Sequence, residues 1–398
     1  MTSHPPLSAF AQRLDVPRTF TEVLGGRPPG AVDLLGGNPA TEALPRVAIA
    51  EAVARAASDP GAPAFQYSSP RGLPRLVDLI AAREGVSPAR VVVANGALHA
   101  LSLIVLALLG PDDVVVTDDP VYPVFRRVLQ LAGSRTVGVG VDSDGLDTDA
   151  LERLLQGGLR PRLVYTVPDF QNPTGATLSA ARRERLADLA HRYGFLVLWD
   201  NPYRRTRWNG REVADAAVDD EAFIRIDTFS KSLGPGLRTG WAVVPEWLVP
   251  ALVAVRSRTD QHPGTLVQAA VADLLAQPGA FDGIVRALAE EHARRASALT
   301  AAIRRDIGSA LTFGEPDGGF FLWTRLADAE LSASRLRELS LARGTAFSAG
   351  EAFAVPGGAS HTDALRLGFS ATPVADIPVA VARIADALDA LDAERSIR

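Results

Sequence analysis

The sequence predicts an α/β protein whose larger part is a mostly parallel sheet covered by helices. Between residues 90 and 245, short runs rich in Val, Ile and Leu alternate with segments long enough to form helices. This order is typical of parallel strands joined by helical crossovers. The chain has 398 residues, which is too long for one simple core and indicates two domains.

The expected elements follow one another in the order that such a sheet requires. Strands are predicted at residues 90–94, 114–117, 136–141, 163–167, 195–199, 223–228 and 241–244. Helices are predicted at residues 7–13, 20–24, 44–57, 179–193, 247–258 and 266–275. In the helix at 179–193, we expect Ser179 to cap the first turn and Arg182, Arg183 and Arg185 to share a solvated face.

A long helix at residues 281–307 is expected to carry the chain from the larger domain into the smaller one. We therefore expect an N-terminal arm and part of the small domain at 1–45, the large domain at 46–285 and the small domain at 286–398. The segment 318–323 is expected to be an edge strand of the small domain, and residues 376–391 a closing amphipathic helix.

The composition excludes several classes of protein. A net charge of −5 and the absence of a basic tract argue against nucleic-acid binding. There is no cysteine, hence no disulfide or thiolate ligand, and no zinc-ligand pattern appears, so no metal is expected. The N-terminus does not resemble a signal peptide, and the longest apolar run, residues 100–109, is too short to span a membrane. A cytoplasmic protein is expected.

One stretch, residues 227–241, carries the strongest chemical signal, and it reads DTFSKSLGPGLRTGW. Of the 41 lysine and arginine residues, only Lys231 is a lysine. Arginine can replace lysine as a surface charge but cannot act as a nucleophile, because its guanidinium stays protonated. A primary amine is what Schiff-base chemistry with a carbonyl or pyridoxal phosphate needs. The alternative is a surface lysine left over in an arginine-biased sequence.

The neighbours of Lys231 favour the chemical interpretation. The predicted strand at 223–228 ends in Thr228, Ser230 precedes the lysine, and Arg238 follows it after a Gly-Pro-Gly break. Hydroxyl groups and a guanidinium at this spacing suit an aldehyde at one end of a ligand and a phosphate at the other. The stretch resembles the fold-type I pyridoxal-phosphate enzymes of aminotransferase class I/II, in particular the aminoadipate/kynurenine-type branch.

The resemblance implies a seven-stranded large-domain sheet and a pyridoxal 5'-phosphate cofactor bound at its edge. It places the phosphate on Gly96, Ala97 and Leu98, which follow a strand and open a helix whose backbone N–H groups favour anions. This branch often has Ser and Gln where this chain has Ala97 and Leu98, so side-chain donors are missing here. Thr228, Ser230 and Arg238 complete the phosphate site.

The same resemblance assigns roles around the cofactor ring. Tyr122, in an Asp-Pro-Val-Tyr sequence, would stack on the ring. Asp200, at the end of a buried strand, would hold the ring nitrogen protonated and make the ring an electron sink. Asn172, in an Asn-Pro-Thr-Gly turn, and Tyr203 would bind the phenolic oxygen. Lys231, Asp200 and Tyr203 are thus the implied catalytic residues.

Three further residues concern the substrate and a partner subunit. Arg366 lies between leucines in a predicted strand and would bind the substrate α-carboxylate, or else form a structural salt bridge. Gly37, in a Gly-Gly-Asn-Pro turn, would pack over the substrate, and Asn172 would also touch it, although an ordinary loop explains Gly37 equally well. Tyr67 would reach the phosphate in the neighbouring subunit of a homodimer, or else serve packing in a loop.

The function expected is a ping-pong aminotransferase that moves an amino group between an α-amino acid and a 2-oxo acid, with biosynthesis of an unusual amino acid as one hypothesis for its pathway. Another reaction of the same cofactor, such as decarboxylation, elimination, cyclisation or oxidation, remains an alternative. A ligand-sensing effector domain is a third interpretation. It is disfavoured by the acidic balance and by the roughly 40 residues before the first core helix, too few for a DNA-binding domain.

Overall fold

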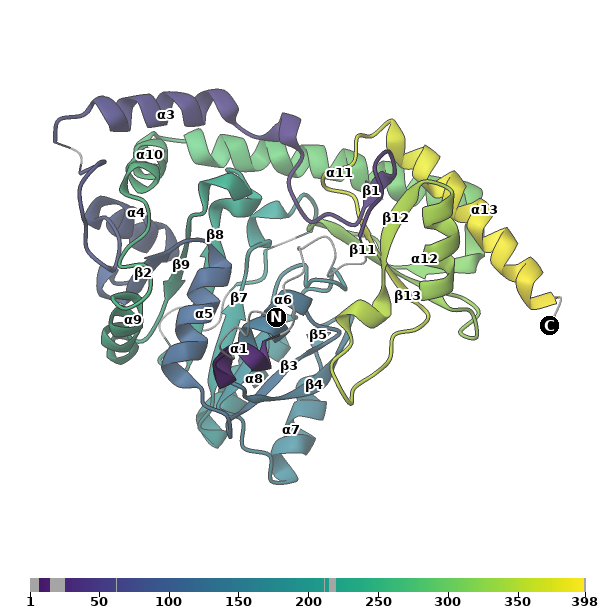
Figure 1. The fold of residues 1–398 in the computed structure, drawn as a ribbon, viewed down its shortest axis with the longest axis horizontal. Coiled ribbons are helices and arrows are strands. Elements are labelled where there is room, and N and C mark those ends of the chain that lie inside the picture. Colours follow the sequence, from purple (N-terminus) through teal and green to yellow (C-terminus); the bar gives the residue numbers. More distant parts are fainter. Residues whose placement is uncertain (1–6, 15–25, 62, 211, 215–219, 397–398) are drawn as a thin grey trace, which may run out of the picture.

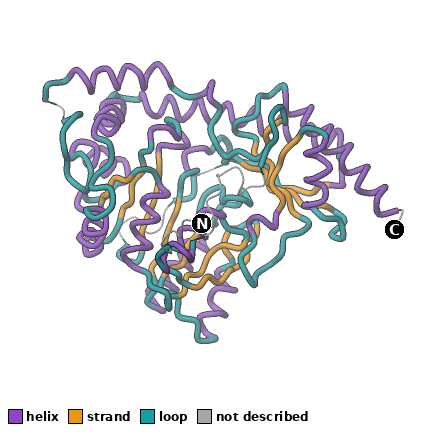
Figure 2. The backbone as a smooth tube through the Cα atoms, in the orientation of Figure 1, coloured by secondary structure: helices purple, strands orange, loops and turns teal. Residues whose placement is uncertain are grey.

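The computed structural model describes residues 7–14, 26–61, 63–210, 212–214 and 220–396. Two sheets organise this part of the chain, each with helices packed outside it (Figure 1). Figure 2 shows the strands gathered in these two groups. Helix α1 (Ala9–Arg13) lies where the first short helix was predicted, whereas the helix predicted at 20–24 falls outside the described residues. None of the helices described here has the length and apolarity needed to cross a membrane.

The large sheet has eight strands in the order β2-β9-β8-β7-β6-β3-β4-β5. Their bounds are β2 Val91–Ala94, β3 Val114–Asp119, β4 Arg135–Asp142, β5 Gly145–Leu146, β6 Leu163–Thr166, β7 Leu196–Asp200, β8 Phe223–Thr228 and β9 Gly240–Val243. Only β5 and β9 run antiparallel to their neighbours. The prediction of a mostly parallel α/β sheet is confirmed. The eighth strand is β5, two residues that turn back along β4.

Strict alternation along the strands explains why helices cover both faces of this sheet. In β2, Val92 and Ala94 pack with helices on one face, whereas Val91 and Val93 pack with helices on the other. The first face carries α5 (Ala97–Leu108), α6 (Pro123–Leu129) and α9 (Val249–Arg256). The opposite face carries α3 (Arg46–Ser58), α4 (Pro74–Glu84), α7 (Thr148–Gln156), α8 (Ala180–Tyr193) and α10 (Thr265–Ala276).

The small sheet has five strands in the order β1-β12-β13-β11-β10. These are β1 Val32–Leu34, β10 Leu311–Phe313, β11 Phe321–Leu326, β12 Thr345–Ala349 and β13 Ala364–Gly368. Its core is closed by α11 (Ala280–Asp306), α12 (Ala333–Ala342) and α13 (Asp376–Ser396). The long helix α11 runs from the large-sheet body to the small-sheet body, as Figure 1 shows, in agreement with the helix predicted at 281–307.

Two local predictions were wrong. The segment 318–323 is not an edge strand, because β11 pairs with β13 on one side and β10 on the other. Arg183 is not solvated: it is 1% exposed and donates to Asp169 at 2.9 Å. The helical repeat places it on the same inward face of α8 as Leu186 and Ala190. Ser179 does occupy the N-cap position, but its side chain accepts no capping hydrogen bond.

Candidate active site

Polar side chains meet at one edge of the large sheet because several strands end there. Strands β2, β3, β6, β7 and β8 run in the same direction, so their carboxyl ends share an edge, and the antiparallel β9 begins there. The loops leaving this edge line a cavity of about 230 Å³. In an open α/β sheet this edge is where ligands bind.

Lys231 enters the cavity from the 3-10 turn Phe229–Lys231 that follows β8. Its Nζ donates to the carbonyl oxygen of Gly37 at 2.7 Å and lies 5.8 Å from the centre of the Tyr203 ring. Burial, together with the charge of Arg366, lowers the pKa of Lys231 to about 8, and the charge of Asp200 opposes the shift. The amine is therefore partly neutral near neutral pH, which is the form that attacks a carbonyl.

Asp200 is the last residue of β7 and is 4% exposed. Its Oδ2 accepts a hydrogen bond from the Tyr165 hydroxyl at 2.9 Å, whereas its buried Oδ1 has no hydrogen-bond partner in the described part of the chain. Burial raises the pKa of Asp200 to about 7, and the hydrogen bond from Tyr165 opposes that rise. A buried carboxylate oxygen without a partner is costly, which indicates a place for a ligand donor.

Asn172, Tyr122 and Tyr203 surround the middle of the cavity. Asn172 lies after β6, and its Oδ1 accepts a hydrogen bond from Arg366 Nη1 at 2.8 Å. Tyr122 lies just before α6, and burial raises the pKa of its hydroxyl, with the charge of Asp200 adding to the rise. Burial also raises the pKa of Tyr203. Both phenols therefore remain protonated donors at neutral pH.

The predicted phosphate end is built from two loops that touch. Gly96, at φ 85°, precedes α5, so the first N–H groups of a 12-residue helix open on the cavity beside Ala97 and Leu98. Arg238 donates through Nη2 to the Asn95 carbonyl at 3.0 Å, and a Cβ on Gly96 would lie 2.6 Å from that nitrogen. Only glycine allows this close approach.

The hydroxyl groups of this end lie on the turn that carries Lys231. Thr228 Oγ1 is 2.9 Å from Ser230 Oγ and 2.9 Å from the Thr239 carbonyl oxygen. Both Thr228 and Ser230 line the cavity with Arg238. Hydroxyl donors, helix N–H groups and a guanidinium are the groups that bind a phosphate dianion, so this end could hold one.

Arg366 comes from the other body of the molecule, strand β13 of the small sheet, and is 1% exposed. Besides Asn172, it donates to the Leu35 carbonyl at 2.5 Å, and its guanidinium lies 4.1 Å from the centre of the Phe321 ring. Its Nε is buried without a partner, and burial lowers its pKa to about 10. No carboxylate pairs with it among the described residues, which leaves its charge available for an anionic ligand.

Gly37 lines the cavity above Lys231, and a Cβ at this position would lie 2.4 Å from Phe321 Cζ. A side chain at this position would therefore clash with Phe321, whereas the predicted packing of Gly37 over the substrate stays a prediction. Tyr67, in contrast, is 79% exposed, and its ring lies 5.8 Å from that of His262. It does not line the cavity of its own chain.

The comparison with known families agrees with this geometry. Residues 31–384 match the model of the family described as aminotransferase class I and II. The chain belongs to this family. Aromatic-amino-acid aminotransferase 1 of Thermococcus litoralis is 30% identical over 369 residues, covering 90% of this chain and 88% of that one. The 2-aminoadipate transaminase of Thermus thermophilus is 32% identical over 373 residues, covering 91% of each.

Among solved structures, LysN, the α-aminoadipate aminotransferase of Thermus thermophilus complexed with N-(5'-phosphopyridoxyl)-L-leucine, superimposes with a TM-score of 0.89 at 30% identity. The match covers 97% of this chain and 98% of that one. This class I/II aminotransferase is therefore a pyridoxal-phosphate enzyme of fold type I in the aminoadipate/kynurenine branch. It acts on an amino acid and a 2-oxo acid.

The residues at the site fit this cofactor. Lys231 supplies the amine, and the unpartnered Asp200 Oδ1 can accept from a ring N–H. Ala97 and Leu98 at the start of α5 line the cavity together with Arg238, where a phosphate would bind. By contrast, no group of three or more His, Cys, Asp or Glu side chains is arranged to hold a metal ion within the described ranges.

Tyr165 and Phe321 are two of the lining residues that the sequence analysis does not predict. The sequence places Tyr165 only in a buried strand and Phe321 only in a strand of the small domain. A hydroxyl in the otherwise apolar strand Leu163–Thr166 was a usable signal, because a buried phenol needs a partner. For Phe321, the contact with Gly37 joins residues 284 positions apart, and nothing local to either residue indicates it.

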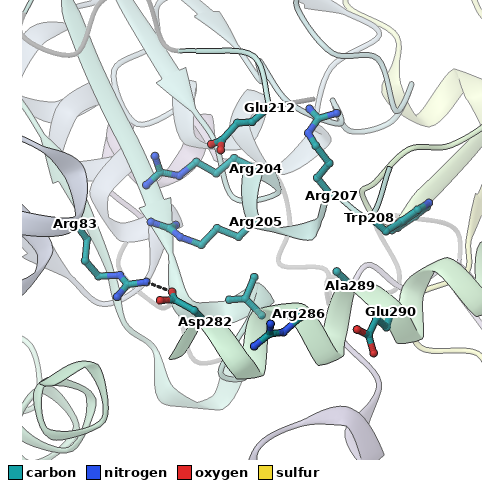
Figure 3. Close-up of a pocket in the computed structure, with 11 residues that line it drawn as sticks. Arg83, Arg204, Arg205, Arg207, Trp208, Glu212, Asp282, Arg286, Ala289 and Glu290 are labelled. Carbon is teal, nitrogen blue, oxygen red and sulfur yellow. Dashed lines mark hydrogen bonds and ion pairs between the residues drawn. The ribbon is translucent and has the colours of Figure 1, made fainter. Parts of the chain in front are cut away.

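A second and larger cavity, of about 590 Å³, lies outside this site (Figure 3). Five of its 11 lining residues are arginines: Arg83 from α4, Arg204, Arg205 and Arg207 after β7, and Arg286 from α11. Arg83 pairs with Asp282 of α11, and Arg204 and Arg205 both pair with Glu84 and Asp227. The buried acids Glu84 and Asp227, which lie outside the lining, are thus paired with lining arginines.

Proposed function

We propose that Lys231, Asp200 and Tyr203 are the catalytic residues of this aminotransferase, which works by a ping-pong mechanism. The observation that carries the proposal is the position of the only lysine: its amine lies inside the cavity, with a pKa near 8, together with Asp200, whose Oδ1 has no partner in the described chain. Bound pyridoxal phosphate supplies an aldehyde that takes up the amino group and a ring that withdraws electrons.

Lys231 has two tasks in this mechanism. Its neutral Nζ holds the cofactor covalently until the substrate amine replaces it. The freed Nζ, held near the ring of Tyr203, would then take the proton from the substrate Cα as a general base and deliver it, as a general acid, to the former aldehyde carbon of the cofactor. A pKa near 8 suits both the uptake and the release of a proton. Part of the amine is neutral at neutral pH and can accept a proton, and its protonated form gives the proton up more readily than an ordinary lysine does.

Other side chains hold charge and orientation around this amine. The Asp200 carboxylate would keep a proton on the ring nitrogen, Tyr122 would stack on the ring, and Asn172 and Tyr203 would donate to the phenolic oxygen. Gly96, Ala97 and Leu98 would offer backbone N–H groups to the phosphate, with Thr228, Ser230 and Arg238 around it.

The substrate carboxylate is assigned to Arg366, with Asn172 and Gly37 beside it. Arg366 already donates to Asn172 and the Leu35 carbonyl, so its fork is fixed in one orientation before a substrate arrives. The small domain would thereby supply the group that binds the substrate α-carboxylate.

The proposed assembly is a cytoplasmic homodimer in which the partner's copy of Tyr67 reaches the phosphate. An aromatic side chain that is 79% exposed in one chain supports a role in contact with another. Within a chain, we place the domain boundaries at 46–285 and 286–398, with residues 1–45 as an N-terminal arm and part of the small domain. The first turns of α11 pack on the large sheet and its later turns on the small one.

The test of the catalytic assignment is Lys231→Ala. The control is Arg286→Ala, which changes an exposed residue of α11. We expect the lysine variant, reconstituted with pyridoxal phosphate, to lose the visible absorbance of covalently held cofactor and to lose turnover, whereas the control keeps both. A Lys231→Ala protein that retained both properties would contradict the assignment.

A second candidate is another reaction of the same cofactor, because the residues around the ring would be shared. Single-turnover spectra separate the two: an aminotransferase accumulates the aminated cofactor and then consumes one equivalent of 2-oxo acid. For the substrates, we propose screening aromatic amino acids, 2-aminoadipate and kynurenine first, since relatives are named for them. Basic and cyclic guanidino amino acids would test the hypothesis of an unusual-amino-acid pathway.

A further inference from the structure

Tyr165 occupies an unusual place for a hydroxyl group. It is in the middle of β6, whose four residues are all buried, and it has no solvent exposure. Its ring stacks on Phe125 of α6, with ring centroids 3.7 Å apart and planes inclined by 16°. The ring is therefore clamped between sheet and helix, and its hydroxyl has one fixed direction.

The hydroxyl points to Asp200 on the neighbouring strand, where it donates to Oδ2 at 2.9 Å. Tyr165 and Asp200 both line the cavity that contains Lys231. Burial raises the pKa of the Tyr165 hydroxyl well above its ordinary value, so it stays a donor throughout the neutral range. The bond therefore fixes one carboxylate oxygen and leaves the other, Oδ1, for the cavity.

We propose that Tyr165 is a positioning residue: it fixes the rotation of the Asp200 carboxylate, keeps that group ionised, and so directs Oδ1 to the cofactor's ring nitrogen. This inference rests on the role proposed for Asp200. An uncharged hydrogen-bond donor suits this place, because a permanent cation would compete with the ring N–H for the same carboxylate.

The charged and titratable groups around this pair explain why a donor is needed. Burial raises the pKa of Asp200, and the charge of Asp227 from β8 adds to that rise. Lys231 lowers it, but this amine is itself partly neutral. Asp118 from β3 and the hydroxyl of Tyr122 act on Tyr165, and both favour its protonated form. Among the hydrogen bonds described, only that from Tyr165 reaches the carboxylate of Asp200.

The test compares Tyr165→Phe with Tyr193→Phe, which removes a hydroxyl from a tyrosine of α8 that contacts Arg192 outside the cavity. Each holoenzyme is reconstituted with cofactor labelled with ¹⁵N in the ring, and the ¹⁵N chemical shift reports whether the ring nitrogen is protonated. We expect Tyr165→Phe to keep its visible absorbance but to shift the ¹⁵N signal towards the unprotonated form.

The cofactor dissociation constant should rise, and kcat should fall, by about 10- to 100-fold, the worth of one hydrogen bond to a charged group. The KM for the amino acid should change little, because Tyr165 is remote from Arg366 in the hydrogen-bond network. Tyr193→Phe should match the parent enzyme in all three measurements. A Tyr165→Phe enzyme with the parent's ¹⁵N shift and cofactor affinity would overturn the proposal.

A double-mutant cycle with Asp200→Asn covers the case in which Tyr165→Phe is merely less stable. If Tyr165 acts through Asp200, the phenylalanine substitution should have almost no further effect on the ¹⁵N shift or on cofactor affinity once Asn is present. Additive losses would assign Tyr165 to packing alone. Should the role of Asp200 itself be wrong, Asp200→Asn would leave the ¹⁵N shift unchanged, an outcome that is distinct from a failure at Tyr165.

Discussion

Two of the cavities lined by the described residues, the arginine-rich one and the one that contains Lys231, differ in how the charges around them are satisfied. Arg204 and Arg205, which line the larger cavity of about 590 Å³, each pair with the buried acids Glu84 and Asp227. In the smaller cavity, of about 230 Å³, the lining residue Asp200 has a buried Oδ1 without a partner in the described chain. Because Arg207 Nε at the larger cavity also lacks a partner among the described residues, the distinguishing feature of the smaller one is an unpaired buried carboxylate oxygen, not its size.

The same contrast appears in the pKa values of the buried acids Glu84 and Asp200. At Glu84, burial acts to raise the pKa, but the charges of Arg204, Arg205 and Arg225 outweigh it and lower the pKa. At Asp200, burial wins and raises the pKa to about 7. The arginines around Glu84 keep its carboxylate ionised without a ligand, whereas the Asp200 carboxylate lacks a cationic partner among the described residues until a ligand supplies one.

The largest loss is expected from Asp200→Asn. Without the carboxylate, the protonated ring nitrogen has no counter-ion, and kcat should fall by about 10²- to 10³-fold, as when one preorganised electrostatic group is removed. Single-turnover rates measured with saturating cofactor isolate this effect from weaker binding. If the rate stayed within about threefold of the parent rate, catalysis in the smaller cavity would not depend on the Asp200 carboxylate.

The next largest effect is expected from Arg366→Lys. Lysine keeps the charge but lacks the forked guanidinium, which can donate to Asn172 and the Leu35 carbonyl and bind a carboxylate at the same time. We expect kcat/KM for the amino acid to fall by about 10- to 100-fold. Binding of the amine-free carboxylate analogue, followed by absorbance, should weaken in parallel. An unchanged KM would leave Arg366 only the structural role of binding Asn172 and the Leu35 carbonyl.

Glu84 pairs with two arginines that line the larger cavity, and Glu84→Gln should affect stability and spare catalysis. The change leaves Arg204 and Arg205 short of one buried acceptor charge, so we expect the free energy of unfolding to fall by about 3 kcal/mol. Urea denaturation measures this loss, with exposed Arg286→Ala as a control expected within about 0.5 kcal/mol of the parent. A collapse of kcat in a folded Glu84→Gln enzyme would show that the two cavities are coupled.

The smallest effect is a shift along the pH axis. Since the pKa of Lys231 is near 8, the rate at which cofactor-free enzyme takes up pyridoxal phosphate should rise with pH and level off above that value, as the neutral amine accumulates. Asp200 raises the pKa of Lys231, so Asp200→Asn should move the midpoint to lower pH. A midpoint near the ordinary lysine value of 10.5 would mean that the amine is not buried in the cavity.

The sequence determined the family, the parallel sheet and most of the residues around the cavity. These features depend on local patterns: alternating apolar runs, the only lysine, and polar residues directly after strands. In a parallel sheet the carboxyl ends of strands must meet at one edge, so Gly96, Asn172, Asp200 and Lys231 could be expected together without coordinates.

Only the tertiary structure decided which groups are left without partners. The hydrogen bond from Tyr165 to Asp200 joins adjacent strands, Arg183 is drawn inwards by Asp169, and β11 lies inside its sheet because β10 returns beside it. Each of these depends on a partner that only the packed chain brings to the group, and the pattern of apolar residues does not identify that partner. Hydrogen-bond satisfaction is a property of the packed chain, and within the described residues it leaves a buried carboxylate oxygen of Asp200 without a partner at the reactive cavity.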